Sequence, residues 1–139
     1  MKKIKTIEKR VLENYLIHSP SKLPIETNFK NSHFVRREKL FLDCLKLPRQ
    51  IFKNAELLDL GCGTGEHDIL YAKWGAKLNL VEINKNSINN LKKYFQKYKL
   101  SKQIKSIKNQ SLFDFKSSKK FDIVISEGVL HHTDNVEKG

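Results

Sequence analysis

The chain has few of the residues that stabilise small secreted domains. Among its 139 residues there are two cysteines, three prolines, one methionine and one tryptophan. Cys44 and Cys62 are too few for a disulfide framework or a zinc site, so we expect a reducing, cytoplasmic setting and no bound metal. No apolar run approaches the roughly 20 residues that cross a membrane, and none follows the basic start. We therefore expect neither a membrane span nor a signal peptide.

Acidic residues are scarce relative to basic ones. The chain has 27 Lys and Arg residues against 15 Asp and Glu residues, which gives a net charge of +12. Such a charge can attract nucleic acid, acidic membranes or acidic substrates. The lysines are spread along the whole chain, which favours a solvated surface, and we expect no specific nucleic acid partner. An RNA-binding or RNA-methylating protein remains an alternative.

Three of the six glycines stand in one turn, around which the chain is organised. Leu57 to Leu60 form a short apolar run that is typical of a buried strand, and the turn Gly61-Cys62-Gly63-Thr64-Gly65 follows it. Residues 66–73 then have the pattern of a partly buried helix, so a βαβ unit begins here. Glycine permits a positive φ and lets a ligand approach the backbone, and free amides at the helix start favour an acceptor or a negative group.

An acidic residue ends the next predicted strand. Residues 77–82 alternate and become apolar before Glu82, which lies about 20 residues beyond the start of the glycine turn. In dinucleotide folds an acid at this distance meets a ribose, because a carboxylate can accept hydrogen bonds from both hydroxyls of a cis-diol. The pattern predicts an adenosine-containing ligand at the carboxyl ends of a parallel sheet.

Two segments resemble the motifs of one enzyme family. The stretch LDLGCGTG at residues 58–65 resembles the first motif of class I S-adenosylmethionine-dependent methyltransferases. The stretch FDIVISEGVLHH at residues 121–132 resembles the fourth-strand motif of the small-molecule branch called type 11 or type 12. The resemblance covers about residues 54–135. It implies an α/β, Rossmann-like fold of three αβα layers with a mostly parallel sheet, and S-adenosyl-L-methionine as the cofactor.

The resemblance also implies a sheet that is incomplete at its carboxyl end. The family has seven strands in the order 3-2-1-4-5-7-6, and the sequence accounts for the first four, at residues 57–60, 77–82, 104–108 and 121–126. The fourth strand would then be an apolar edge. Helices are predicted at residues 6–17, 34–47 and 66–73, and a fourth helix is predicted from a cap at Asn84, Asn86 or Ser87 to about residue 98. We expect residues 1–50 to cover the sheet and the cofactor mouth, and residues 51–139 to form the cofactor-binding half.

The resemblance assigns roles to individual residues. Gly61 and Gly63, in the turn with Cys62 and Gly65, would lie against the methionine part, and Asp59 would orient its ammonium group. Glu82 would hold both ribose hydroxyls, with Ile83 against the adenine. The family often has an Asp after strand three, and Gln110, Ser111 or Leu112 would replace it here.

Glu127 would stand at the mouth of the site, and His131 or His132 would act as base or pack beside the ligand. Arg36 or Arg37 would pair with the methionine carboxylate or be a surface residue.

The predicted activity is transfer of a methyl group by in-line displacement. The acceptor would be a small molecule, a lipid precursor or a sugar, methylated on oxygen, nitrogen or carbon.

An NAD-dependent dehydrogenase would more often have G-x-G-x-x-G, whereas Glu66 follows the third glycine here. Enzymes that methylate bases usually have Asn-Pro-Pro-aromatic where this chain has Ser126-Glu127-Gly128-Val129. A non-catalytic fragment that keeps part of the cofactor site remains a second alternative. The sequence does not predict an oligomeric state.

Overall fold

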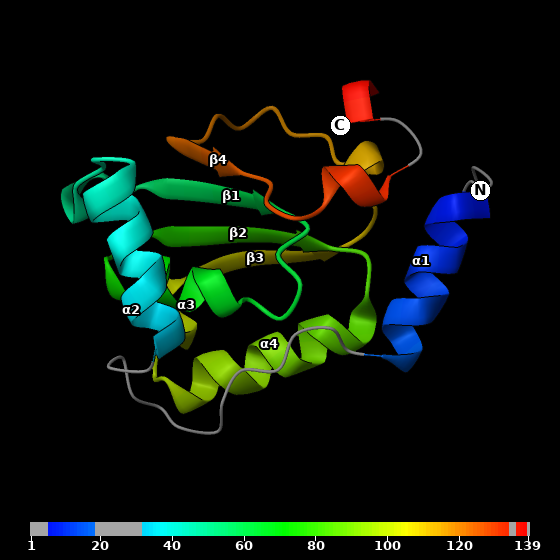
Figure 1. Ribbon diagram of the computed structural model, residues 1–139, viewed down its shortest axis with the longest axis horizontal. Coiled ribbons are helices and arrows are strands. Elements are labelled where there is room, and N and C mark those ends of the chain that lie inside the picture. The colour runs from blue at the N-terminus through cyan, green and yellow to red at the C-terminus, as the bar shows by residue number, and fades with distance from the viewer. Residues whose placement is uncertain (1–5, 19–31, 134–135, 139) are drawn as a thin grey trace.

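A parallel sheet of four strands forms the centre of the described structure. The computed structural model describes residues 6–18, 32–133 and 136–138. Figure 1 shows the strands pointing the same way, so that their carboxyl ends meet at one edge, beside helix α1. The strand order is β3-β2-β1-β4, as expected from the sequence. The strands are β1 (Glu56–Leu60), β2 (Lys77–Glu82), β3 (Ile104–Asn109) and β4 (Ile123–Ile125).

Four α-helices are described, and two have the predicted bounds. These are α1 (Thr6–Ile17) and α3 (Glu66–Lys73). The predicted helix at residues 34–47 is α2 (Ser32–Lys39), which continues as a π-helical turn, η1 (Leu40–Cys44). Helix α4 (Lys85–Lys97) is capped by Asn84, one of the three residues predicted as candidate caps. In the described ranges, no helix is long and apolar enough to cross a membrane.

One face of the sheet packs against α2, α3 and α4. Leu57 of β1 and Leu78 and Leu80 of β2 have no exposed surface and share one apolar core with these helices. Because side chains alternate along a strand, the intervening residues Leu58 and Asn79 lie on the opposite face. There they line a cavity of about 150 Å³ together with side chains of the segment that precedes β4. The alternation therefore separates an apolar face from a mixed one.

Four aromatic side chains join η1, α3 and η2 (Arg49–Phe52), a 3-10 turn that precedes β1. The rings of Phe52 and Tyr71 are stacked with centroids 5.1 Å apart, and Phe41 meets both rings edge-on at 5.5 Å. Trp74, at the end of α3, lies 5.0 Å from Phe52. Such pairs add to the apolar area that each ring buries. They hold α2 and η1 against α3, and so place the residues of α2 beside the glycine turn.

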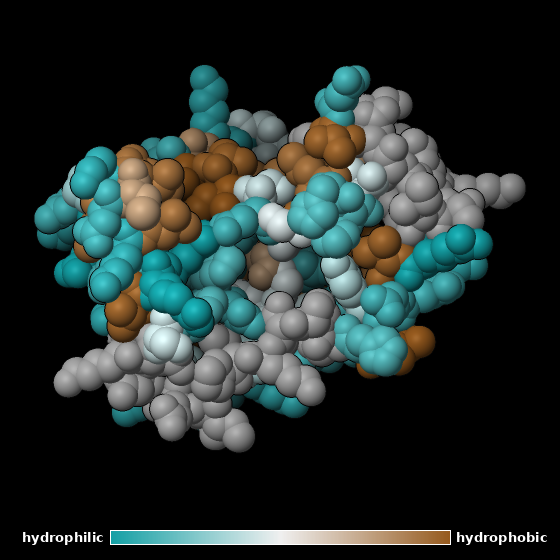
Figure 2. Space-filling view, in the orientation of Figure 1, coloured by the Kyte–Doolittle hydropathy of each residue, from teal (hydrophilic) through white to brown (hydrophobic). Residues whose placement is uncertain are grey.

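Strand β4 forms an edge of the sheet, as the sequence predicted. It is shorter than the predicted strand 121–126, because only three of its residues pair with β1. Val124 of β4 is 58% exposed. Figure 2 shows apolar side chains gathered over β4 and the end of α2, while hydrophilic side chains cover much of the rest of this view. The apolar character that the sequence predicted for this edge is confirmed.

Candidate functional site

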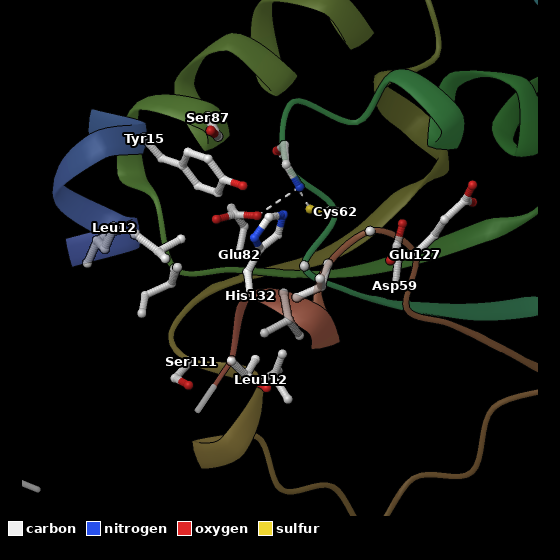
Figure 3. Close-up of a pocket in the computed structure, with 18 of the residues that line it drawn as sticks. Leu12, Tyr15, Asp59, Cys62, Glu82, Ser87, Ser111, Leu112, Glu127 and His132 are labelled. Carbon is white, nitrogen blue, oxygen red and sulfur yellow. Dashed lines mark hydrogen bonds between the residues drawn. The ribbon is translucent and has the colours of Figure 1, made fainter. Parts of the chain in front are cut away.

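A cavity of about 370 Å³ opens at the carboxyl edge of the sheet. Figure 3 shows Glu82 and His132 near its middle, with Leu12 and Tyr15 of α1 on one side and Glu127 on the other. Parallel sheets commonly bind ligands at this edge, where the strand order reverses. The cavity is lined by Val11, Leu12, Tyr15, Asp59, Gly61, Cys62, Gly63, Thr64, Glu66, His67, Val81, Glu82, Ile83, Ser87, Gln110, Ser111, Leu112, Phe113, Glu127, Gly128, Val129, His132 and Thr133.

The glycine turn forms the floor of this cavity. The backbone N–H groups of Gly61 and Cys62 donate to the carbonyl of Val81, at 2.8 and 3.2 Å, and fasten the turn to β2. Gly61 has a φ of +88°, and a Cβ there would lie 2.4 Å from a methyl group of Val129. Gly63 has a φ of +57°, and a Cβ there would have no atom within 4 Å. Gly61 is therefore packed, whereas Gly63 leaves its backbone open to a ligand.

Glu82 is a buried carboxylate held by two backbone amides. It is 8% exposed, and it accepts hydrogen bonds from the N–H groups of Gly63 (2.8 Å) and Asn84 (2.7 Å). Burial raises the pKa of Glu82, and the two amides oppose this effect. A carboxylate oxygen can accept more than one hydrogen bond. The side chain is fixed in place and can still accept a bond on each oxygen from a ligand.

Asn84 links Glu82, α4 and α1. Its side-chain oxygen accepts from the N–H groups of Asn86 and Ser87 and caps α4. Its side-chain nitrogen donates to the carbonyl of Tyr15 in α1, at 3.1 Å. The ring of Tyr15 also meets His132 edge-on, with centroids 5.8 Å apart. These two contacts, both made by Tyr15, therefore attach the C-terminal turn of helix α1 to the cavity.

Replacing Asn84 by serine should loosen α1 without removing the cap of α4. A serine hydroxyl can accept from the first amides of α4 but cannot replace the bond to the carbonyl of Tyr15. One hydrogen bond is worth about 1 kcal/mol, so we expect roughly fivefold faster amide exchange in residues 6–18. Hydrogen-exchange mass spectrometry measures this rate. Asn86→Ala, at an exposed position of α4, is the control and should leave it unchanged. Equal exchange in all three proteins would contradict the attachment.

Arg37 and Glu127 form an ion pair across the site, although their residues are far apart in the sequence. The Nη1 atom of Arg37 donates to Oε1 of Glu127 at 2.7 Å, and Nη2 donates to Oε2 and to the hydroxyl of Tyr71. Arg37 is 8% exposed, so the surface alternative is wrong for this residue, whereas Arg36 is exposed. The bond from Arg37 lowers the pKa of Glu127, whose ionised form therefore faces the cavity.

Asp59 brings another carboxyl group to the cavity, whereas Asp68 is buried and does not line it. Asp59, in β1, is 6% exposed, and Asp68, in α3, is 0% exposed. Burial, together with the carboxylates of Glu127 and Glu82, raises the pKa of Asp59 to about 7. Burial and the neighbouring Asp59 raise the pKa of Asp68 well above its usual range. Asp68 is therefore a fully buried acid in a helix that the sequence predicted to be partly buried.

His67 is a further residue of the site that the sequence did not single out. It lines the cavity, and its Nδ1 lies 3.5 Å from Oε2 of Glu127. Its ring stacks on His33 of α2, with centroids 5.5 Å apart. Burial and the charge of Arg37 lower the pKa of His67 to about 4, so the ring is neutral at neutral pH. Its place in the first turn of α3, two residues after the last glycine of the turn, was the available signal.

Most of the predicted site residues come together in the cavity. Two do not. Gly65 is the N-cap residue of α3, and a Cβ at this position would lie 2.9 Å from the side chain of Leu91. His131 is exposed, and the centroid of its ring lies 3.9 Å from that of His132. Neither one lines the cavity. The predicted residues that line it are Asp59, Gly61, Cys62, Gly63, Glu82, Ile83, Gln110, Ser111, Leu112, Glu127 and His132.

The charge of the cavity is opposite to that of the chain. The net charge of the chain is +12, yet the lining contains four acidic residues. These are Asp59, Glu66, Glu82 and Glu127, and no Lys or Arg stands among the described residues of the lining. Arg37 lies behind Glu127 and is paired with it. Carboxylates in a partly closed cavity attract a cation and repel an anion.

The sequence of this region matches a known family. A family model described as "Methyltransferase domain" matches residues 58–139. The chain belongs to this family. The membership confirms the predicted class I S-adenosylmethionine-dependent methyltransferase and S-adenosyl-L-methionine as the cofactor of the family. In this methyltransferase domain, the matched residues include the end of β1, the glycine turn, Glu82 and the segment after β4.

Individual relatives agree with the family. The ubiquinone biosynthesis O-methyltransferase of Pelagibacter ubique (strain HTCC1062) is 29% identical over 85 residues, which are 61% of this chain and 34% of that relative. The chain thus spans about a third of the length of that relative.

Solved structures show a similar fold. Magnesium protoporphyrin IX methyltransferase from Synechocystis PCC 6803 with bound SAM has a TM-score of 0.70 at 16% identity, and the match covers 99% of this chain and 69% of that one. N-methyltransferase NodS from Bradyrhizobium japonicum WM9 has a TM-score of 0.63 at 17% identity, covering 94% and 61%. These structures confirm the predicted Rossmann-like fold.

Proposed function

We propose that the acid-lined cavity binds S-adenosyl-L-methionine and that the chain is the cofactor-binding part of a small-molecule methyltransferase. The observation that carries this proposal is a lining with four acids and, among the residues that the structure describes, no Lys or Arg, in a chain with a net charge of +12. S-adenosyl-L-methionine has a sulfonium, an ammonium and one carboxylate, so it is a cation. NAD has an anionic pyrophosphate, which these carboxylates would repel. The same repulsion argues against nucleic acid inside this cavity.

The side chains of the cavity fit the parts of this cofactor. Glu82 has acceptor capacity for two ribose hydroxyls, and Gly63 has open space above its backbone. Asp59, at the methionine end of the predicted site, and Glu127, predicted at its mouth, would balance the ammonium group. Ile83 and the segment Gln110–Leu112 would enclose the adenine, where Ser111 caps a short 3-10 turn, η4 (Leu112–Asp114). Helix α1 would cover the cofactor through Val11, Leu12 and Tyr15.

In methyl transfer, the main role of the chain would be to position the reactants. When bound, the cofactor supplies an electrophilic methyl group whose leaving group is a neutral thioether. The cavity would hold the acceptor in line with this methyl group and exclude water, and such positioning can supply much of the acceleration. His132 lines the cavity beside Tyr15, and partial burial lowers the pKa of His132, so its ring is neutral near pH 7. A neutral ring nitrogen there would take the proton of a hydroxyl acceptor.

The acceptor is proposed to be a small molecule. The relatives support this, since by their names one acts in ubiquinone biosynthesis and another acts on magnesium protoporphyrin IX. The apolar part of the lining, with Val11, Leu12, Val129 and Phe113, suits an acceptor with an apolar portion. Because the chain spans only part of these proteins, the acceptor is a proposal for the whole protein.

Calorimetric titration of the chain with S-adenosyl-L-methionine and with NAD tests the proposal. We expect binding of the first ligand only. Glu82→Gln should weaken it about 100-fold, because two hydrogen bonds to a charged group contribute roughly 3 kcal/mol. Glu56→Gln is the matched control, since Glu56 lies at the other end of the sheet in β1 and bonds Lys119. Binding of NAD instead, or equal affinities of Glu82→Gln and the parent chain, would refute the proposed site.

A further inference from the structure

The positive charge of the chain is concentrated in one segment. Residues 83–113 contain eight lysines and no Asp, Glu or Arg, so they supply +8 of the net charge of +12. In the rest of the chain, 15 acidic residues offset 19 basic ones. All eight lysines are exposed. The segment has no acid of its own to pair with them, so its charge faces solvent.

Six of these lysines form one surface along α4 and just beyond it. One side of α4 packs into the core through Ile88, Leu91 and Phe95. The other side is exposed and continues into η3 (Ser101–Gln103), a 3-10 turn that contacts α4. We call this surface the basic face, and its lysines are Lys85, Lys92, Lys93, Lys97, Lys99 and Lys102. The ammonium group of Lys105 donates to the carbonyl of Lys102 at 3.2 Å and adds a further charge there.

An apolar tip lies beside the start of the basic face. It consists of Leu16 and Ile17, at the end of α1, which are 45% and 75% exposed. The side chain of Asn84 joins this end of α1 to α4, because it donates to the carbonyl of Tyr15 and caps the helix that begins at Lys85. Figure 1 shows the two helix ends side by side. Exposed apolar side chains next to lysines are typical of surfaces that bind at a membrane interface.

The composition of the basic face favours lipid over nucleic acid. Sites for nucleic acid are rich in Arg, whose planar guanidinium matches a phosphate, and residues 83–113 contain none. Single strands also bind to exposed aromatic rings, on which their bases stack. Every aromatic side chain of this segment, which the structure describes throughout, is buried or half-buried. Lysine charges and an apolar tip instead match the phosphates and acyl chains of an anionic bilayer.

We propose that the basic face docks on an anionic lipid surface and that Leu16 and Ile17 insert between the lipids. A cluster of about four to eight Lys or Arg residues is typical of segments that bind anionic lipids. The apolar tip adds a contact that depends on the acyl chains and not on charge. The docking does not depend on which cofactor the cavity binds.

Docking would bring the cavity to the lipid surface. Val11, Leu12 and Tyr15 of α1 line the cavity, and the same helix ends in the apolar tip. An acceptor with an apolar portion would pass from the bilayer to the cavity along α1. This consequence rests on the proposed function, because it takes the cavity to be the site of methyl transfer.

Co-sedimentation with lipid vesicles tests the docking. The chain should bind vesicles of equal parts of phosphatidylglycerol and phosphatidylcholine, and should not bind vesicles of phosphatidylcholine alone. Because salt screens exposed charges, sodium chloride at about 0.5 M should weaken the binding at least about tenfold. Absence of binding to the anionic vesicles, or equal binding to both kinds, would overturn the inference without any variant.

Lysine substitutions test whether the basic face is the surface that binds. A lysine near an anionic membrane strengthens binding about fivefold, so three substitutions together should weaken it about 100-fold. These are Lys85→Gln, Lys92→Gln and Lys93→Gln. The matched control makes the same change at three exposed lysines of α2, η2 and the segment before β4, namely Lys39, Lys53 and Lys120. The control has the same net charge and should lose less than about threefold, because its lysines lie away from the basic face. Equal losses would show that net charge alone explains the binding, and the inference would be wrong.

The apolar tip distinguishes lipid from nucleic acid. Ile17→Ser should weaken vesicle binding about tenfold, because acyl chains would no longer bury this side chain. Ile51→Ser is the control, since Ile51 is 40% exposed in η2, at the other end of the sheet, and its substitution should have no effect. If Ile17→Ser binds vesicles like the parent chain, or if single-stranded RNA binds the chain more tightly than anionic vesicles do, the basic face is not a lipid surface.

Titration with S-adenosyl-L-methionine separates this inference from the proposed function. The variant with three substitutions in the basic face should bind the cofactor like the parent chain, because none of its three lysines lines the cavity. If the parent chain binds anionic vesicles but not the cofactor, the proposed function fails and the docking stands. If it binds the cofactor but not the vesicles, the docking is wrong and the proposed function stands.

Discussion

Replacing Arg37 by methionine should lower the free energy of unfolding by about 2 kcal/mol, less than for a fully buried ion pair, because the side chain of Arg37 is 9% exposed but that of Glu127 is 46% exposed. Three contacts disappear together: the paired bonds to Glu127, the bond to Tyr71 and the position of the guanidinium 5.2 Å from the ring of Phe41. Tyr71 is fully buried and would keep a hydroxyl without this donor. Chemical denaturation followed by circular dichroism measures the loss.

Arg36 provides a matched control for Arg37. It is the preceding residue of the same helix, it is exposed, and its Nε bonds only the carbonyl of Ser32 among the described contacts. Arg36→Met removes the same charge and the same side-chain length, so its effect should stay below about 0.5 kcal/mol. Equal losses in the two variants would mean that net charge, and not the contact with Glu127, explains the effect.

Alanine should lower stability more at Gly61 than at Gly63, and should weaken cofactor binding more at Gly63. Both glycines have a positive φ, so either substitution costs about 1–2 kcal/mol of backbone strain. At Gly61 the new methyl group would also meet Val129 at 2.4 Å, and overpacking adds roughly 1–3 kcal/mol. We therefore expect Gly61→Ala to lose about 3 kcal/mol or more of stability, and Gly63→Ala to lose only the strain.

The binding effect should be larger at Gly63. A methyl group there enters open space above a backbone that lines the cavity, where we propose that the cofactor lies. Gly63→Ala should fold and should bind S-adenosyl-L-methionine at least tenfold more weakly. The measurements are thermal melts of both variants and titration of the folded one. If Gly63→Ala binds like the parent chain, the ligand does not lie against this part of the turn.

Local patterns predicted the fold well because each element has a strong local signal. The spacing of apolar residues gave helix α3 its correct bounds, and Asn84 is the cap that its residue type suggests. Glu82 was placed at the ligand site because it follows a buried strand at a known distance from the glycine turn. These features depend on neighbours in the chain, and a sequence displays such neighbours directly.

The parts that the sequence did not predict depend on contacts between distant residues. Arg37 and Glu127 are 90 positions apart, and nothing near either residue distinguishes Arg37 from the exposed Arg36. Asp68 looks like a polar residue of a half-exposed helix, and its burial follows from how α3 sits on β1. The short β4 also reflects pairing with β1 rather than its own apolar run. The ion pair and the buried acid of the site therefore depend on tertiary packing, which the sequence does not display.

The central claim is that the acid-lined cavity holds S-adenosyl-L-methionine with its ribose at Glu82. The most direct test is a crystal structure of the chain grown with this cofactor. We expect both ribose hydroxyls to donate to the carboxylate of Glu82, with the methionine part between Gly63 and Glu127. A ligand bound elsewhere, or one in the cavity whose ribose lies away from Glu82, would contradict the claim.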